Sequence, residues 1–200
     1  MTLEFFFDCS SPWTYLGFET VQNVAAECGA EITWKPILVG GVFNAVNRQI
    51  YTNREDPEAP KMQHMHKDLT DWARHQNLDI RFPPSVFPVN SVKVMRGCIV
   101  CQEEGKLVPY ARAAFRSYWG EDKDISQDLV VRQICAEVGL DADDHLARIA
   151  EPAVKDQLRA NTEELIERGG FGTPTIFVGG SDMYFGNDRM PFVKAALQAG

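Results

Sequence analysis

The sequence predicts an α/β domain assembled from both ends of the chain, with an all-helical domain inserted between the two halves. Strand patterns occur only near the ends, and helical periodicity fills the middle of the 200-residue chain. Strands from both ends bury their apolar faces most simply by sharing one sheet. We therefore expect residues 1–45 and 169–200 to form the α/β domain and residues 46–168 to form the helical insertion.

The N-terminal part is predicted to be a strand, a helix and a second strand. Residues 3–7 form an apolar run typical of a buried strand, and residues 31–36 form the second strand. Pro12 suits the first turn of the helix between them, where a backbone N–H has no partner in any case. One face of this helix repeats in steps of four residues, at Leu16, Thr20, Val24 and Cys28. A helical crossover makes the two strands parallel, with a right-handed connection.

The middle of the chain is predicted to contain a loop region followed by a series of helices. Residues 40–60 are rich in Gly, Asn and Pro and are predicted to be a loop. Helical patterns then follow to about residue 168. The apolar faces that define three of them are Met62, Met65, Leu69 and Trp72; Val130, Ile134 and Val138; and Val154, Leu158 and Leu165. Ser126 is expected to cap the second of these helices, and Asp141 with Asp144 to open the helix after it.

The strand signature returns after Gly169 and Gly170. Residues 175–178 read as a strand, followed by a Gly-Gly-Ser-Asp turn and a second strand at residues 183–185. A terminal helix begins at about residue 188. These elements complete the sheet begun at the N-terminus.

Composition and charge exclude some classes of partner. The net charge is −8, which argues against a nucleic-acid partner, because phosphate binding needs a concentrated basic patch. No apolar run approaches the ~18 residues that a membrane-spanning helix needs, and the N-terminus lacks the basic region of a signal peptide. We expect a cytoplasmic protein with no membrane association.

The cysteines and histidines give no strong signal of redox or metal chemistry. Five scattered cysteines in such a chain indicate reduced thiols. Cys98 and Cys101 form a C-x-x-C, but they lie inside a helical pattern with no strand before them, so we expect two buried helix-face thiols. His64 and His66 point to different faces of a helix, and no carboxylate cluster completes a site with them. We therefore expect no metal.

The turn after the first strand raises the question of function. A strand, a tight turn and a Pro in the first helical turn often hold a C-x-x-C motif. Residues 11–14 read Ser-Pro-Trp-Thr instead, and Cys9 lies two residues too early. The chain thus has Ser11 where a redox protein holds its nucleophilic cysteine.

Two further motifs stand near the C-terminal strands. In Phe-Gly-Thr-Pro-Thr, at residues 171–175, Pro174 enters a strand after a Gly-rich turn, a favourable place for a cis peptide bond. A cis bond there would present the backbone of Thr173 to an extended peptide; a trans Pro that merely starts the strand is the alternative. Asn187 and Asp188 lie where a helix begins, and they either bind a carboxylate and an ammonium or only cap the helix.

Together these motifs resemble one enzyme family. FFFDxxSPWTYLGF, FGTPTIFVGG and MYFGNDR are similar to motifs of the kappa-class glutathione transferases and, within that group, of the 2-hydroxychromene-2-carboxylate isomerases of bacterial aromatic degradation. The similarity covers essentially the whole chain. It implies a thioredoxin-like fold with a helical insertion, a homodimer, and glutathione as cofactor. It also implies that Ser11 is the catalytic residue, whose hydroxyl hydrogen-bonds the sulfur of glutathione and attacks nothing itself.

The resemblance implies a set of glutathione-binding residues. Thr173, before Pro174, would pair its backbone with the cysteinyl unit. The γ-glutamyl end and the wall beside it would be formed by Phe185, Gly186, Asn187 and Asp188. Lys61 matches a lysine that faces the glycyl carboxylate. Asn47 matches a loop asparagine, although the loop appears one residue shorter here.

The resemblance also points to substrate contacts, with one departure. Asn53 and Arg54 are similar to an Asn-Arg pair that contacts acidic substrate in the isomerases, although a solvated loop arginine is an equal alternative. A family lysine is replaced by Phe43 or Asn44, depending on the alignment. Phe87 is a candidate aromatic wall; so is a tryptophan, Trp119, but core packing is the alternative for both.

The expected function is a glutathione-dependent isomerase of a small aromatic carboxylate. Two alternatives remain. A kappa-class transferase or peroxidase would share the glutathione site but consume glutathione. A non-catalytic thioredoxin-fold binder would have no need of the glutathione contacts at Lys61, Asn187 and Asp188.

Overall fold

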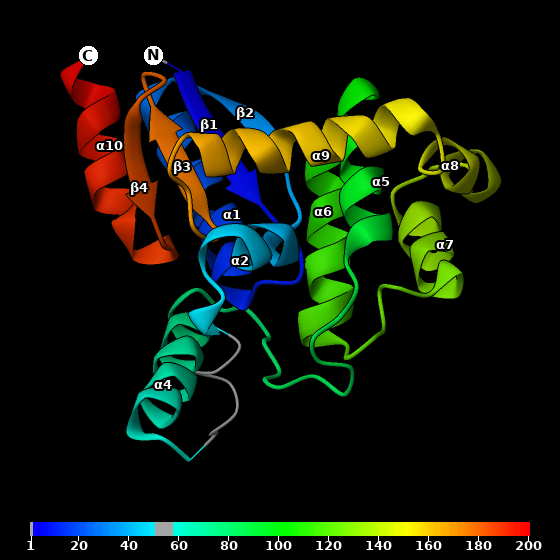
Figure 1. Ribbon diagram of the computed structural model, residues 1–200, viewed down its shortest axis with the longest axis horizontal. Coiled ribbons are helices and arrows are strands. Elements are labelled where there is room, and N and C mark those ends of the chain that lie inside the picture. The colour runs from blue at the N-terminus through cyan, green and yellow to red at the C-terminus, as the bar shows by residue number, and fades with distance from the viewer. Residues whose placement is uncertain (1, 51–57) are drawn as a thin grey trace.

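A four-stranded sheet joins the two ends of the chain. The computed structural model describes residues 2–50 and 58–200 (Figure 1). The strands β1 (Thr2–Phe7), β2 (Glu31–Pro36), β3 (Thr175–Val178) and β4 (Asp182–Phe185) lie in the order β2-β1-β3-β4. β1 pairs with β2 in parallel, and β3 pairs with β1 and β4 in antiparallel fashion. The prediction of one α/β sheet built from both ends is confirmed.

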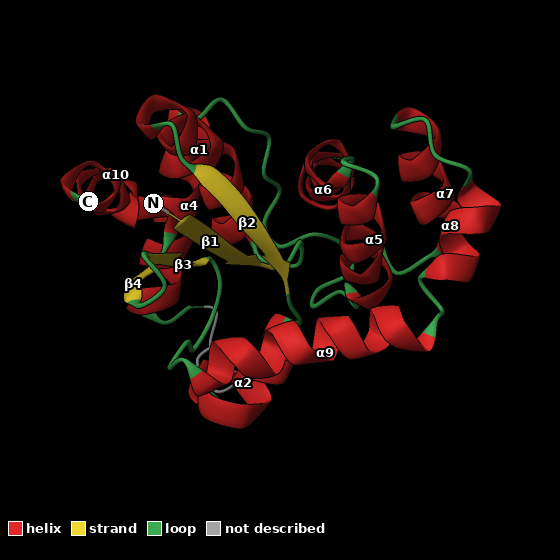
Figure 2. Ribbon diagram, turned by 90° about the horizontal axis from the view of Figure 1, so that it is seen from above, coloured by secondary structure: helices red, strands yellow, loops and turns green. Residues whose placement is uncertain are grey.

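Helices cover both faces of this sheet. Figure 2 shows α1 (Pro12–Cys28) and α10 (Met190–Ala199) on one side, and α2 (Val39–Val46) with α9 (Pro152–Glu167) on the other. Successive side chains of β1 point to opposite faces of the sheet, and because the strand is apolar throughout, both faces of the sheet are apolar. Phe5 and Phe7 pack with Phe18 of α1 in the main core, whereas Phe6 points to the other face and packs near Leu165 of α9. The continuous apolar run at residues 3–7 therefore buries both of its faces.

The helical insertion lies between β2 and β3 in the chain. Within the described residues, the helices that precede α9 there are α4 (Pro60–His75), α5 (Val92–Glu103), α6 (Leu107–Phe115), a π-helical turn (Arg116–Gly120), α7 (Asp128–Glu137) and α8 (Ala142–Arg148). The described residues of the insertion contain no strand, in agreement with the predicted fold class. α9 then leads back to the sheet: Val154 and Leu158 lie in the main core, and Leu165 packs on the sheet face. The boundaries at residues 45/46 and 168/169 stay a prediction.

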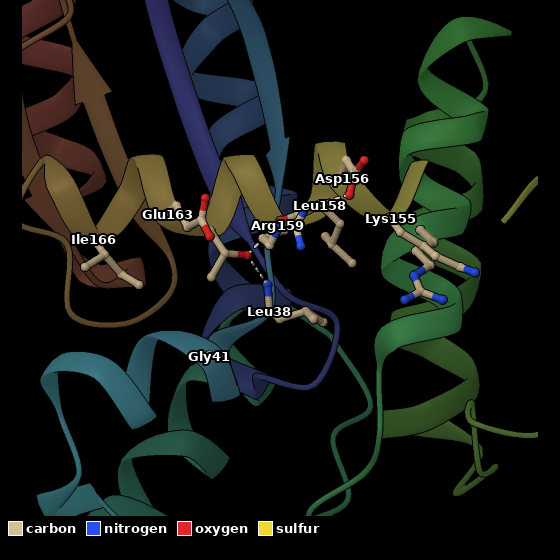
Figure 3. Close-up of a pocket in the computed structure, with 10 residues that line it drawn as sticks. Leu38, Gly41, Lys155, Asp156, Leu158, Arg159, Glu163 and Ile166 are labelled. Carbon is tan, nitrogen blue, oxygen red and sulfur yellow. Dashed lines mark hydrogen bonds and ion pairs between the residues drawn. The ribbon is translucent and has the colours of Figure 1, made fainter. Parts of the chain in front are cut away.

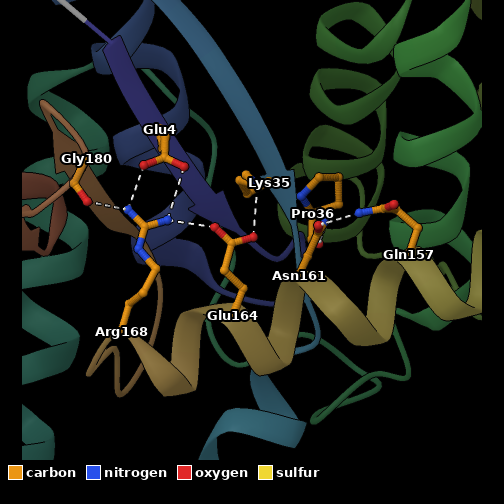
Figure 4. A network of polar contacts seen from close by, with 8 residues as sticks. All are labelled: Glu4, Lys35, Pro36, Gln157, Asn161, Glu164, Arg168 and Gly180. Carbon is orange, nitrogen blue, oxygen red and sulfur yellow. Dashed lines mark hydrogen bonds and ion pairs between the residues drawn. The ribbon is translucent and has the colours of Figure 1, made fainter.

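A polar network anchors the end of α9 to the sheet (Figure 4). Arg168 donates to Glu4 of β1 at 2.6 Å and to Glu164 at 2.7 Å. Glu164 in turn accepts from Lys35 of β2 at 2.9 Å. The Arg168 guanidinium also lies 3.8 Å from the ring centroid of Phe177. These charges are only partly exposed and act as a cluster, so they hold α9 to β1 and β2 more firmly than isolated surface pairs would.

Two local predictions are wrong. α2 occupies Val39–Val46, and all but its first residue lie in the region expected to be a loop. Gly40 and Gly41 each cost about 1 kcal/mol in a helix relative to Ala, but Val39 and Val42 are buried, and their packing overrides that propensity. Ser126 does not cap α7, because the cap position is the residue after it, with no side-chain bond; the Ser126 N–H instead donates to Asp124 Oδ1 at 2.9 Å.

Candidate active site

Ser11 is the N-cap of α1. Its backbone is extended, with φ −110° and ψ 122°, and its Oγ accepts from the Thr14 N–H at 3.2 Å. Its own hydroxyl hydrogen points to the Thr173 carbonyl oxygen across a long 3.4 Å contact. The cap bond therefore fixes the oxygen, while the hydrogen is weakly engaged and can turn to a better acceptor.

A chain of hydroxyl groups locks the Thr173 loop to α1. Thr173 Oγ1 donates to the Phe6 carbonyl oxygen at 3.1 Å. Because each hydroxyl has one hydrogen, Thr14 Oγ1 must be the donor in its 3.0 Å contact with Thr173 Oγ1. Thr14 and Thr173 are both buried, so this chain sets the distance between the first turn of α1 and the loop before β3.

The Thr173–Pro174 peptide bond is cis, as predicted. Among the described residues, the Thr173 N–H makes no hydrogen bond. α1 packs closely on this loop: a Cβ on Gly17 would lie 3.0 Å from Pro174 Cγ. The Thr173 N–H is thus available to pair with an extended chain laid against the loop.

The turn after β4 is tied to the same loop. The Gly186 N–H donates to the Pro174 carbonyl oxygen at 3.0 Å. Gly186 has φ +107°, and a Cβ there would lie 2.7 Å from Asp188 Oδ1, so glycine is required. Asn187 is only 5% exposed, and its Nδ2 has no hydrogen-bond partner in the described residues. A buried amide donor without a partner costs about 1–3 kcal/mol, which a bound carboxylate could recover. Asp188 is partly exposed, 3.5 Å from Arg189.

A cavity of about 290 Å³ opens beside Ser10. It lies between the turn after β1, the first turn of α2 and the segment before α5. Its lining includes Asp8, Ser10, Val39, Phe43, Phe87 and Ser91. The walls are mostly apolar with a few polar groups, which is the usual composition of a small-molecule site.

Asp8 holds the three walls of this cavity together, and sequence reasoning missed it. The side chain is 1% exposed; Oδ1 accepts from the Ser10 N–H at 2.9 Å and Oδ2 from the Val39 N–H at 2.8 Å. The Ser91 side chain hydrogen-bonds the same carboxyl group. Burial raises the pKa of Asp8, and these hydrogen bonds lower it by less. The sequence feature that could have identified Asp8 is the position of an acidic residue directly after an apolar strand.

Of the two remaining predicted glutathione residues, Asn47 contacts this region, and Lys61 makes no contact with it among the described residues. Asn47, just after α2, donates from Nδ2 to the Phe171 carbonyl oxygen at 3.2 Å. The Phe171 ring lies 4.4 Å from that of Phe185, so Asn47 borders the same wall. Lys61, in the first turn of α4, is exposed, and within the described residues its amine has no partner. The structure therefore brings together Ser11, Thr173, Pro174, Phe185, Gly186, Asn187 and Asp188.

Of the residues predicted to contact substrate, one lines the cavity, one lies in the core, and two lie outside the described residues. Phe87 is half-buried, lines the cavity and packs 5.2 Å from the Phe82 ring. Trp119 is fully buried and donates from Nε1 to the Cys9 carbonyl oxygen at 2.9 Å, so it is a core residue and no wall. Asn53 and Arg54 lie outside the described residues.

No thiol of the chain stands where Ser11 does. All five cysteines are free, and Cys9, Cys98 and Cys101 are buried. Burial raises the pKa of the Cys98 and Cys101 thiols. In the described part of the chain, no three His, Cys, Asp or Glu residues are grouped as metal ligands. None of the helices there is both long and apolar enough to cross a bilayer.

Comparison with known proteins agrees with this geometry. Residues 2–198 match the DSBA-like thioredoxin domain. The chain is 29% identical over 196 residues to 2-hydroxychromene-2-carboxylate isomerase of Sphingobium xenophagum, covering 98% of this chain and 97% of that protein. It is 27% identical to human glutathione S-transferase kappa 1 over 209 residues, covering 98% and 90%. A solved structure of 2-hydroxychromene-2-carboxylate isomerase superposes with a TM-score of 0.84 at 25% identity, covering all of this chain and 95% of that one.

Proposed function

The chain belongs to the DSBA-like thioredoxin domain family, and we propose that it is a glutathione-dependent isomerase with 2-hydroxychromene-2-carboxylate as substrate. Relatives with that name match over nearly their whole length. The observation that carries the proposal is the Ser11 hydroxyl, held by a cap bond at the N-terminus of α1 with its hydrogen weakly engaged. A disulfide oxidoreductase needs a thiol at this position, and this chain has none.

The open polar groups around Ser11 fit glutathione, a peptide with two carboxylates and one ammonium. The unpartnered Thr173 N–H can pair with its cysteinyl unit. The buried Asn187 Nδ2 can donate to the γ-glutamyl carboxylate, and the Asp188 carboxylate can take the ammonium. The exposed Lys61 amine, on α4, would face the glycyl carboxylate, and Asn47 would border the same end.

The same residues account for a thiolate at neutral pH. A free thiol has a pKa near 8.5, and each unit of lowering requires about 1.4 kcal/mol. The N-terminus of a helix such as α1 stabilises an anion by about 0.3–1 and at most about 2 kcal/mol. A hydrogen bond from Ser11 to a charged sulfur adds about 1.5–3 kcal/mol. The helix N-terminus and the hydrogen bond together are enough to favour the thiolate, whereas neither alone reliably gives a thiolate at neutral pH.

When bound, glutathione supplies a thiolate that adds reversibly to a conjugated double bond and so permits rotation about it. The chain orients this chemistry. Ser11 donates its hydrogen bond to the sulfur, and the cavity beside Ser10 holds the aromatic ring against Phe43 and Phe87. Arg54, with Asn53, is proposed as the clamp for the substrate carboxylate.

The test is a spectrophotometric assay of 2-hydroxychromene-2-carboxylate conversion, with and without glutathione. We expect turnover only with glutathione, and a loss of about 10–150-fold in kcat/KM for Ser11→Ala, the equivalent of one charge-assisted hydrogen bond. Ser126→Ala, a serine in the helical insertion, is the matched control and should keep full activity. Glutathione binding without turnover would retain the glutathione site and reject the substrate.

A second candidate is a kappa-class transferase that consumes glutathione. Phe43 favours it, because this aromatic side chain lines the cavity near the place where the isomerases carry a lysine, and an apolar electrophile would fit there. Conjugation of 1-chloro-2,4-dinitrobenzene without isomerase activity would select the transferase.

The third candidate is a non-catalytic binder that does not bind glutathione. Its melting temperature would not change when glutathione is added. A protein that binds glutathione, at a hundred times the Kd, should gain about 2.7 kcal/mol of stability.

Location and assembly complete the proposal. Five free cysteines, most of them buried, are consistent with the reducing cytoplasm. A homodimer is proposed from the resemblance alone, and size-exclusion chromatography with light scattering would test it.

A further inference from the structure

A second and larger cavity lies away from Ser11. It has a volume of about 500 Å³ and runs beneath α9, between α9, α2 and α5 (Figure 3). Leu38, Leu158 and Ile166 give it an apolar floor. Leu38 and Gly41 also line the cavity beside Ser10, so the first turn of α2 separates the two. The groove is therefore a distinct space that a ligand at Ser11 does not fill.

The groove contains basic side chains without partners. Among the described residues, almost every lysine and arginine has an ion pair or a hydrogen bond. The exceptions are Lys61, Arg96 and Lys155, and two of these three line this groove. The Nε of Arg96 is buried and has no hydrogen-bond partner in the described part of the chain. In a protein of net charge −8, two unpaired cations beside one cavity are an unusual concentration.

The other charges of the groove restrict the ligand. Arg159 is already paired with Asp156 at 2.6 Å, and so neutralises it. Glu163 lines the groove farther along α9 and disfavours a second negative group. Figure 3 shows Lys155 and Ile166 at opposite ends of the row of side chains, with Glu163 beside Ile166, so the positive and negative ends of the groove are separated along α9.

We propose that this groove binds a small organic monoanion. The charged group lies between Arg96 and Lys155, where the planar guanidinium suits the geometry of a carboxylate or sulfonate. The apolar body lies on Leu38 and Leu158. This inference does not depend on the proposed isomerase activity and stands if that activity is absent.

The probe is 8-anilinonaphthalene-1-sulfonate, an aromatic monoanion whose fluorescence rises on an apolar surface. Titrations are made with saturating glutathione, which occupies the proposed site at Ser11. We expect Arg96→Gln to raise the Kd about tenfold and Lys155→Gln, which changes an exposed side chain, about threefold. Glu163→Gln should lower the Kd two- to threefold, and its near-ultraviolet circular dichroism must stay native, because partly unfolded protein also binds this dye more strongly. Lys106→Gln, a lysine bonded to the Gly139 carbonyl oxygen elsewhere in the insertion, is the matched control with no change.

A neutral analogue separates the charge from the apolar floor. N-phenyl-1-naphthylamine lacks the sulfonate, so its affinity should be unchanged by all three groove substitutions. If Arg96→Gln loses its near-ultraviolet circular dichroism, the exposed Lys155 and Glu163 variants decide the question. The proposal is overturned if the sulfonate binds all variants within twofold of the unchanged protein, or if glutathione abolishes its binding.

Discussion

The first turn of α1 and the middle of α5 differ in the conditions they offer to sulfur. Ser11 is partly exposed at the N-terminus of a helix, beside an open backbone N–H. Cys98 and Cys101 lie inside a helix, both buried, and burial raises the pKa of both thiols. A reactive thiolate needs access and the positive end of a helix dipole. Position in the fold, more than a C-x-x-C pattern, therefore predicts where sulfur chemistry can occur.

The largest effect is expected when a thiol replaces the Ser11 hydroxyl at the start of α1. In an assay to which oxidised glutathione is added, Ser11→Cys should lower glutathione-dependent turnover more than a hundredfold, because the introduced thiolate attacks the added disulfide, forms a mixed disulfide and releases one glutathione thiolate. Mass spectrometry of the intact protein should show one glutathione adduct.

The control for that variant is the unchanged protein under the same conditions. Its Cys98 and Cys101 should stay unmodified, because both are buried with raised pKa values. Adducts on either cysteine of the native protein would contradict the comparison.

Adding one methyl group in each region should separate stability from binding. A Cβ on Gly97, in α5, would lie 2.2 Å from the Tyr110 hydroxyl and 2.7 Å from His145 Nε2. Gly97→Ala should therefore lower the free energy of unfolding by about 2–3 kcal/mol, the cost of overpacking a core, with glutathione affinity unchanged in the folded fraction. Urea denaturation and calorimetric titration measure the two.

Gly186→Ala is the counterpart at the site. Its φ of +107° and the 2.7 Å approach to Asp188 mean that a methyl group must displace the carboxylate. We expect the Kd for glutathione to rise about tenfold, with a stability loss of about 1–2 kcal/mol. Equal glutathione affinity in the two alanine variants would remove Asp188 from the proposed site.

Substitution of Asp8 tests whether its hydrogen bonds hold the walls of the cavity together. Asn lacks one of the two acceptor oxygens, so Asp8→Asn should cost about 1–3 kcal/mol of stability near neutral pH. The cost should shrink as the pH rises from 4 toward 8. Burial raises the pKa of Asp8, so the folded state binds the proton more tightly than the unfolded state, and the native carboxyl loses stability as it ionises. Urea denaturation across this range checks the sign.

His145 should show the smallest effect, with the opposite pH dependence. Its ring is buried against the Tyr110 hydroxyl at 3.1 Å, and burial lowers its pKa. The unfolded state then binds the proton more readily, so the native protein loses stability as the pH falls below about 6.5. His145→Gln should flatten the stability curve there. A curve of unchanged slope would show that other groups dominate the acid response.

Much of the fold was predictable from the sequence because its signals are local. The apolar run at residues 3–7, Pro12 at a helix start and the glycines before residue 175 each act on their own neighbours. Thr173 and Pro174 could be singled out for the same reason. The residues around Ser11 were named from a resemblance, and their grouping is now seen in the hydrogen bonds among three turns.

Tertiary structure alone decided the rest. α2 forms in spite of two glycines because Val42 is buried and the Val39 N–H reaches Asp8. Arg96 and Lys155 line one groove because α5 and α9, far apart in the chain, pack against each other. Propensity and periodicity describe a residue and its near neighbours. The burial of a charge, or the lack of a partner for it, depends on which distant segment packs beside it.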